Sequence, residues 1–162
     1  MDIEMTVNAL IIDPTTNMPI VVLRDLEGQR VLPIWVGVFE ANAIALQIEN
    51  VETPRPMTHD LLKQMVDALG GLVERIVVCE LKENTFYATI HLETARGAIV
   101  VDARPSDAIA LALRTRSKIF VDESVIQSHK MGEMSRDEKM DIGRLQKWLE
   151  GLSDDDLGKY KM

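Results

Sequence analysis

The sequence predicts an α+β protein built from a duplicated unit of three strands and one helix. The strands are expected to form a mainly antiparallel or mixed sheet with packed helices. Two apolar helical segments each follow three strand-like segments, and both contain Ala-Ile-Ala-Leu, at 43–46 and 108–111. The same offset aligns Ile11 with Ile76 without a gap. If the two units are related, we expect them to pack around a pseudo-two-fold axis.

The first unit is predicted from alternation and from turn residues. Branched and apolar residues alternate in "EMTVNALIID", and "IVVLR" and "RVLPIW" continue the pattern. Asp13-Pro14 and Glu27-Gly28 are typical of turns between strands. Residues 39–50 are predicted to form the first helix, and the two prolines of "VETPRP" indicate a loop after it.

A second helix is predicted between the two units. Thr58 is expected to cap residues 59–69, and Gly70-Gly71 to end the helix. The apolar residues of this segment form one helical face, which comprises Leu61, Leu62, Met65, Val66 and Leu69.

The second unit repeats the order of the first. Three strands are predicted in "LVERIVVCEL", "TFYATIHLE" and "AIVVDA", followed by a helix over 105–114 and a short strand over 118–122. We therefore expect a domain over 1–127, a polar linker over 128–135, and a C-terminal amphipathic helix within 136–162.

Composition narrows the class of protein. The net charge of −8 disfavours extended binding to nucleic-acid duplexes, although a local basic site remains compatible with it. No apolar run approaches the roughly 18 residues that a membrane span needs. Cys79 is the one cysteine, and the N-terminus does not resemble a signal peptide, so we expect a cytoplasmic protein. A homo-oligomer is compatible with the long β-rich units.

Polar residues gather at the start of the helix at 105. Pro105 suits a first helical turn, and Ser106 or Asp107 could cap it, so these residues have a purely structural explanation. Arg104 does not, because a cation beside a helix N-terminus is disfavoured unless an anion or a carboxylate joins them.

The start of the helix at 58 has a similar pattern. "RPMTHD" again places an arginine and a proline before a hydroxyl and an aspartate. Two such helix starts would favour phosphate binding through Arg55, Arg104 and Ser106. His59 could act as a general acid or base, or could simply face solvent. We expect these loops to converge in one cleft that also contains Asp60 and Asp107.

Carboxylates at helix starts could also bind a metal. Glu40, Asp60 and Asp107 would offer oxygen ligands for Mg²⁺ or Mn²⁺, although Glu40 also suits the first turn of its helix without any metal. No established metal motif, phosphate-binding glycine loop or Gly-x-Ser-x-Gly turn occurs. The basic run "RTRSK" at 114–118 is expected to complement the end of its helix rather than to contact nucleic acid.

Four separated motifs together resemble the bifunctional nuclease family. They are "LPIWVGVFEANAIALQIE", "RPMTHDLLKQMVDALGG", "FYATIHL" and "DARPSDAIALALRTRSKIFVDESVI", and the resemblance spans about residues 5–127. It implies a nuclease that acts on both DNA and RNA with little sequence preference. The positions that match these motifs are Glu40, Arg55, His59, Asp60, Arg104, Ser106 and Asp107.

Our leading hypothesis is metal-assisted hydrolysis of phosphodiester bonds. His59, Asp60 and Asp107 would be catalytic, and Arg55 and Arg104 would bind phosphate oxygens. The alternative is a non-catalytic module that binds a ligand or a protein, or that directs assembly. An open cleft joining 55–60 to 104–107 would favour the enzyme. Burial of Arg104 against Asp107 would favour the module.

Overall fold

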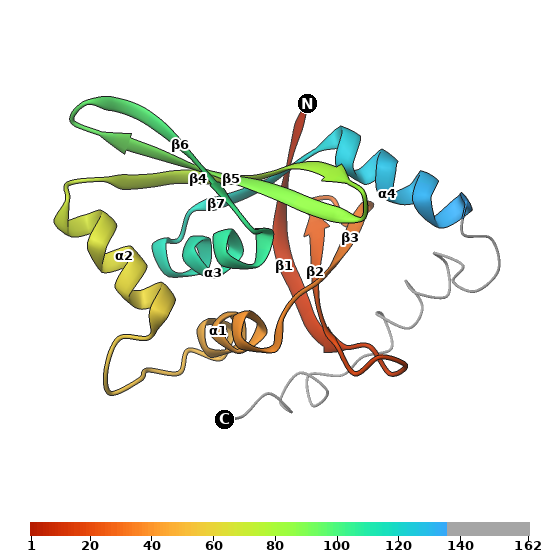
Figure 1. Cartoon of the computed structure of the whole chain (residues 1–162), viewed down its shortest axis with the longest axis horizontal. Coiled ribbons are helices and arrows are strands. Elements are labelled where there is room, and N and C mark those ends of the chain that lie inside the picture. The colour runs from red at the N-terminus through yellow and green to blue at the C-terminus, as the bar shows by residue number, and fades with distance from the viewer. Residues whose placement is uncertain (136–162) are drawn as a thin grey trace.

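The computed structural model describes residues 1–135, in which seven strands form one mixed sheet and four helices pack against it (Figure 1). The predicted α+β class is therefore confirmed. The strands are β1 (Asp2–Ile12), β2 (Pro19–Asp25), β3 (Val31–Trp35), β4 (Leu72–Lys82), β5 (Thr85–Thr94), β6 (Gly97–Ala103) and β7 (Lys118–Asp122). The helices are α1 (Val38–Ile48), α2 (Thr58–Ala68), α3 (Pro105–Thr115) and α4 (Glu123–Ser135).

The sheet joins two antiparallel three-strand meanders through β7. The strand order is β3-β2-β1-β7-β4-β5-β6. Strand β7 is antiparallel to β1 and parallel to β4, with Ile119 opposite both Met5 and Ile76. Each meander is followed by a helix that begins directly after its third strand, which is the order that the sequence predicts. Superposition of the two units stays a prediction.

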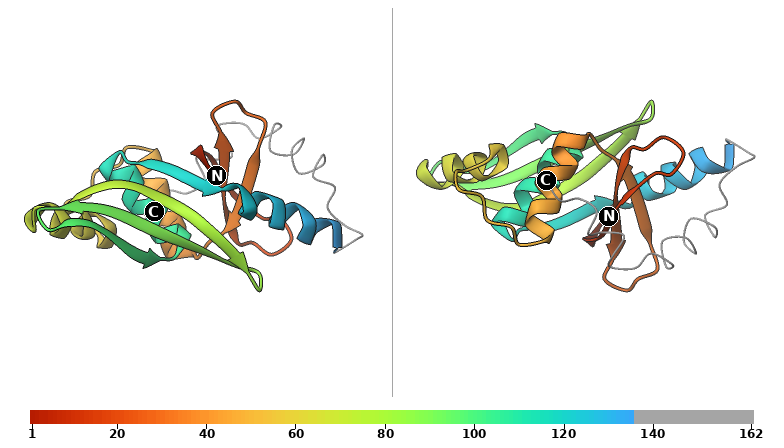
Figure 2. Two further views of the ribbon diagram at one scale, coloured as in Figure 1. Left: turned by 90° about the horizontal axis from the view of Figure 1, so that it is seen from above. Right: turned by 90° about the horizontal axis from the view of Figure 1, so that it is seen from below.

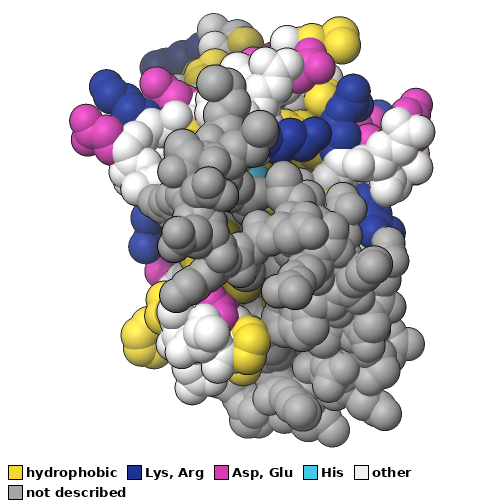
Figure 3. Space-filling model, turned by 90° about the vertical axis from the view of Figure 1, so that its right-hand side faces the viewer, with side chains coloured by type: hydrophobic (Ala, Val, Ile, Leu, Met, Phe, Trp, Pro, Cys, Tyr) yellow, Lys and Arg dark blue, Asp and Glu magenta, His cyan; other side chains and the backbone are white. Residues whose placement is uncertain are grey.

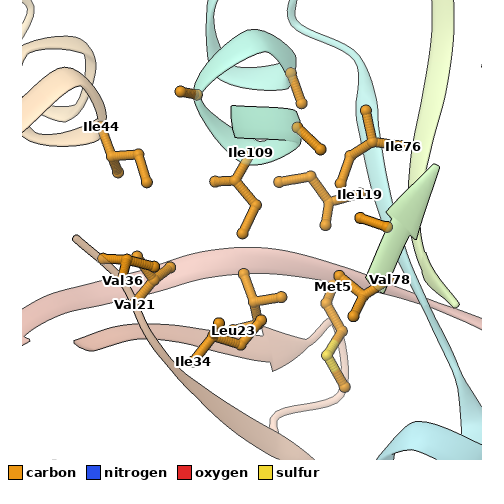
Figure 4. Packing of buried hydrophobic residues seen from close by; sticks show 14 of the residues in the cluster. Met5, Val21, Leu23, Ile34, Val36, Ile44, Ile76, Val78, Ile109 and Ile119 are labelled. Atoms are coloured by element: carbon orange, nitrogen blue, oxygen red, sulfur yellow. The ribbon is translucent and has the colours of Figure 1, made fainter. Parts of the chain in front are cut away.

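Helices α1, α2 and α3 lie together on one side of β4–β6 (Figures 1 and 2). Pro105 occupies the first turn of α3, and the following Ala-Ile-Ala-Leu segment is almost completely buried. Ile109 of α3 and Ile44 of α1 are both 0% exposed and point into the core between the two meanders (Figure 4). Burial of each branched side chain of this size stabilises the folded state by about 1.5–3 kcal/mol. Packing in the core therefore explains the repeated Ala-Ile-Ala-Leu segment without any function.

The predicted apolar face of α2 is not buried by the described part of the chain. Leu61, Met65 and Leu69 are 52%, 53% and 82% exposed. The predicted cap is also wrong, because Thr58 is already helical and Met57 precedes it as the N-cap. Helix α2 therefore contacts the domain through His59, its buried residue, and through Val66, the one member of the predicted apolar face that packs against the core.

Residues 128–135, which the sequence predicts as a polar linker, form part of α4. The division of the chain into a domain over 1–127 and a C-terminal extension stays a prediction. Asp122 starts this helix: its Oδ1 accepts hydrogen bonds from the N–H and hydroxyl of Ser124. Val125 and Ile126 are then buried, at 1% and 3% exposure, which anchors the helix to the domain. The predicted C-terminal amphipathic helix within 136–162 lies outside the described residues. Within residues 1–135, no helix is long and apolar enough to cross a membrane.

Candidate active site

Three carboxylates stand at the third position of three helices. Glu40, Asp60 and Asp107 follow the N-cap residues of α1, α2 and α3 by three positions. Asp60 Oδ2 accepts a 3.0 Å hydrogen bond from the backbone N–H of Met57, as in a capping box. The Glu40 carboxylate folds back against Gly37, where a Cβ atom would collide with it. Each acid thus also favours its helix start, where partial positive charge gathers.

Arg104 joins α1 to α3 through two of these carboxylates. Its Nη2 donates a 2.7 Å hydrogen bond to Glu40 Oε1, and its Nε donates a 2.9 Å bond to Asp107 Oδ2. These carboxylates, Asp107 foremost, raise the pKa of Arg104. They also explain why an arginine is tolerated beside a helix N-terminus. The Arg104 side chain stays 66% exposed, so it is not buried against Asp107 as the non-catalytic alternative requires.

His59 binds the other oxygen of Asp107. Its Nε2 lies 2.9 Å from Asp107 Oδ1, and the residue is 8% exposed. An ionised carboxylate can only accept hydrogen bonds, so Nε2 carries the proton and Nδ1 is the basic nitrogen of a neutral His59. A histidine oriented in this way by a carboxylate is a recognised arrangement for proton transfer.

Asp60 has a different partner from its neighbour His59. Arg114 Nε donates a 2.7 Å hydrogen bond to Asp60 Oδ1, and two further bonds reach the carbonyls of Ala43 and Ala110. Burial acts to raise the pKa of Asp60, but the hydrogen bonds from Met57 and Arg114, with the charge of Arg114, outweigh it. The net result is a pKa below the ordinary value.

Arg114 is the functional residue of this region that the sequence does not single out. Its side chain is 3% exposed, whereas the basic run 114–118 was expected to complement the helix end from outside. Asp107 and Arg114 are seven residues apart on α3, which is close to two helical turns, so they face the same side. This spacing is the signal that could have revealed that both residues contact the first turn of α2.

An open cavity of about 550 Å³ lies beside Asp60 and Arg114. It includes Arg55 and Asp60 but none of residues 104–107, so this cavity does not join the two helix starts, and a cleft shared by all these residues stays a prediction. The 55–60 segment divides instead: His59 faces Asp107, while Arg55 and Asp60 line the cavity. Ser106 is 6% exposed and lies within the buried face of α3.

The three predicted metal ligands do not form one site. Glu40 and Asp107 bind Arg104, and Asp60 binds Arg114, so the partner of each carboxylate is an arginine. Within residues 1–135, no group of three His, Cys, Asp or Glu side chains is arranged to hold a metal ion. The donor set as arranged does not fit a shared Mg²⁺ or Mn²⁺ ion.

Charges elsewhere on the surface are mixed. The face shown in Figure 3 carries lysine and arginine beside aspartate and glutamate among its described residues. The described residues on this face carry charges of both signs, and the net charge of −8 disfavours extended binding to a nucleic-acid duplex.

The chain belongs to the bifunctional nuclease domain family, because the model of that family matches residues 21–133. An uncharacterized protein of Mycobacterium tuberculosis is 42% identical over 123 residues, which are 76% of this chain and 73% of the relative. Bifunctional nuclease 2 of Oryza sativa is 31% identical over 68% of this chain, and bifunctional nuclease 1 of Arabidopsis thaliana is 30% identical over 70% of it. The matches span 35% and 36% of these two plant proteins.

Proposed function

We propose that this protein is a nuclease that hydrolyses phosphodiester bonds of DNA and RNA with little sequence preference. The observation that carries the proposal is the continuous hydrogen-bonded chain from His59 through Asp107 and Arg104 to Glu40. It brings a histidine and an exposed guanidinium together where three helices begin. Membership of the bifunctional nuclease domain family supports the same reaction.

Each member of this chain has a distinct proposed role. His59 transfers the proton, either from the attacking water or to the departing oxygen. Asp107 holds the imidazole in one orientation and stabilises its protonated form, as carboxylates do in other histidine pairs. Arg104 contacts a non-bridging phosphate oxygen, where its charge offsets the charge that develops during attack. Glu40 is a positioning residue that holds Arg104.

A mechanism of this kind needs no hydrogen bond to the edge of a base, and this agrees with little sequence preference. Arginine recognises the phosphate group that all nucleotides share. Arg55, which is exposed in the neighbouring cavity, is proposed to contact a further phosphate. Dependence on Mg²⁺ or Mn²⁺ stays a prediction, and the experiment below tests it directly. A cytoplasmic location is also proposed, and the single free cysteine agrees with a reducing compartment.

The test is cleavage of labelled single-stranded RNA and DNA by highly purified protein, with Mg²⁺, with Mn²⁺ and with EDTA. His59→Ala and Asp107→Ala are compared with His91→Ala, a matched control on β5 whose imidazole contacts Thr89. Cleavage by the wild type and by His91→Ala, but not by the other two, supports the proposal. Equal cleavage in all preparations indicates a contaminant and contradicts it.

A non-catalytic binding or assembly module remains the second candidate, and one observation favours it. The apolar residues of α2 are exposed, Leu69 by 82%, which is typical of a surface that another chain covers. This candidate takes the lead if no preparation cleaves either substrate. Light scattering of the eluting protein tests the associated proposal of a homo-oligomer, since a monomer at all concentrations would contradict it.

A further inference from the structure

The cavity beside Asp60 is distinct from the His59–Asp107 pair. It is bordered by the end of α1 and the loop after it, by α2, and by the end of α3. The charged residues of its lining are Glu52, Arg55, Asp60, Lys63, Arg114 and Arg116. A volume of about 550 Å³ lies within the range of roughly 300–1,000 Å³ for small-ligand sites.

The cavity has the opposite charge to the protein as a whole. Four cationic side chains and two carboxylates line it, whereas the whole chain carries a net charge of −8. Arg114 and Asp60 neutralise each other in a 2.7 Å ion pair. Within residues 1–135, Arg55, Lys63 and Arg116 form no ion pair, and the remaining acid, Glu52, is exposed.

These three cations come from three separate segments. A structural role within any one segment would not explain why all three side chains line the same cavity. Arg55 lies in the loop, Lys63 on α2, and Arg116 at the end of α3. Arg116 has a left-handed backbone, with φ of 56°, at a helix end where glycine or asparagine is the usual residue. A cation does complement a helix C-terminus, but that role explains Arg116 alone and not its convergence with Arg55 and Lys63.

We infer that this cavity binds a phosphate group of the nucleic-acid strand through Arg55, Lys63 and Arg116, as a subsite separate from His59. The nature of the ligand rests on the proposed nuclease function. Helix α2 carries both sites, because His59 lies in its first turn and Lys63 follows about one turn further along the helix. A strand whose scissile phosphate reaches His59 would therefore extend along the first turn of α2 into the cavity.

Binding of thymidine 5′-monophosphate, followed by NMR titration, tests the subsite without any turnover. The double variant Lys63→Gln/Arg116→Asn removes two of the three cations, and asparagine tolerates the left-handed backbone at 116. Lys82→Gln/Arg96→Asn is the matched control, since both of its residues are exposed and neither lines the cavity. Loss of charge-assisted hydrogen bonds should weaken binding about tenfold in the first variant and less than about twofold in the control.

Three results would overturn the inference: equal binding of thymidine without its phosphate, unchanged affinity in Lys63→Gln/Arg116→Asn, or an equal loss in the control.

Cleavage of an oligonucleotide of about ten nucleotides separates failure of the subsite from failure of the proposed function. With both correct, the Lys63→Gln/Arg116→Asn variant raises KM about tenfold and leaves kcat unchanged. If the wild type binds the monophosphate through these residues but never cleaves, the subsite stands and the nuclease proposal fails. If cleavage requires His59 but Lys63→Gln/Arg116→Asn binds the monophosphate normally, the nuclease proposal stands and the subsite fails.

Discussion

Arg114 and Asp60 join α3 to α2 through a 2.7 Å hydrogen bond from Nε to Oδ1, and the arginine side chain is 3% exposed. Because the same guanidinium also binds the carbonyl of Ala43 in α1, one side chain fixes three helices relative to one another. The His59–Asp107 pair depends on that arrangement, since its two residues belong to α2 and α3. Stability and the geometry of the candidate site are therefore linked through Arg114.

Replacing this arginine should destabilise the protein strongly. Arg114→Leu removes the side-chain donor that binds the carbonyl of Ala43 and the carboxylate of Asp60, and breaking a buried ion pair costs about 3–5 kcal/mol. Since Asp60 keeps partial access to water, we expect about 3 kcal/mol from urea unfolding. Arg96→Leu, on an exposed turn, should change the free energy of unfolding by less than about 0.5 kcal/mol. Similar values for the two variants would show that Arg114 does not join the helices.

The Asp60 carboxylate should make stability depend on acid pH. Its pKa is lower in the folded protein than the value of about 3.9 expected after unfolding. The ionised Asp60 carboxylate therefore contributes fully to the free energy of unfolding above pH ~4. This contribution is lost as the pH falls through the lower pKa of the folded state. Urea unfolding of the wild type and Asp60→Asn should differ most at neutral pH, and the difference should shrink below pH ~4. A difference that is constant across this range would contradict the shift.

His59 and Asp107 should behave as one functional unit in catalysis. Loss of a general acid or base lowers rates about 10²–10⁴-fold, and we expect His59→Ala to fall in this range. Because Asp107 acts through His59, and Glu40 still holds Arg104, adding Asp107→Ala to His59→Ala should lower kcat little further. Single-turnover cleavage by the two single variants and the double variant measures this coupling. Effects that multiply in the double variant would mean that the two residues act independently.

Gly37 should control the position of Glu40. An alanine is compatible with the extended backbone at 37, but its Cβ would collide with the Glu40 carboxylate and displace it from Arg104. We expect Gly37→Ala to lower kcat about tenfold while the domain stays folded, since the arginine that offsets the developing charge then loses one of its two carboxylates. The same substitution in a Glu40→Gln background should add little. A full further loss in that background would place the effect of Gly37 elsewhere.

Local patterns in the sequence predict most of the elements. Alternation and turn residues locate all seven strands, and three helices begin within one residue of their predicted starts. These features depend on neighbours in the chain, so the chain alone is sufficient to locate them. Helix α4 was missed because its signal is short: Asp122 as an N-cap, followed by Val125 and Ile126.

The sequence predicts the candidate site only in part. The carboxylates Glu40, Asp60 and Asp107 are recognisable as helix-start residues, but their partners depend on how the helices cross. His59 and Asp60 are neighbours in the chain, but their partners, Asp107 and Arg114, are seven positions apart on α3. The cavity combines loop, α2 and α3 residues, and no periodic pattern connects segments so far apart in the chain.

The two edges of the sheet differ in a way that limits how copies of the chain could add to one another. Strand β3 ends the sheet with only five residues, and Pro33 removes one backbone donor from it. Strand β6 ends the opposite side with seven residues, among which Ile99, Val100 and Val101 are 44%, 57% and 41% exposed. Among the described strands, β6 therefore has the longer unpaired edge, and we expect a strand from another chain to add at β6 rather than at β3. Pairing of two β6 strands would use up the receptive edge of both chains, and growth would stop at a closed pair instead of continuing into a fibre.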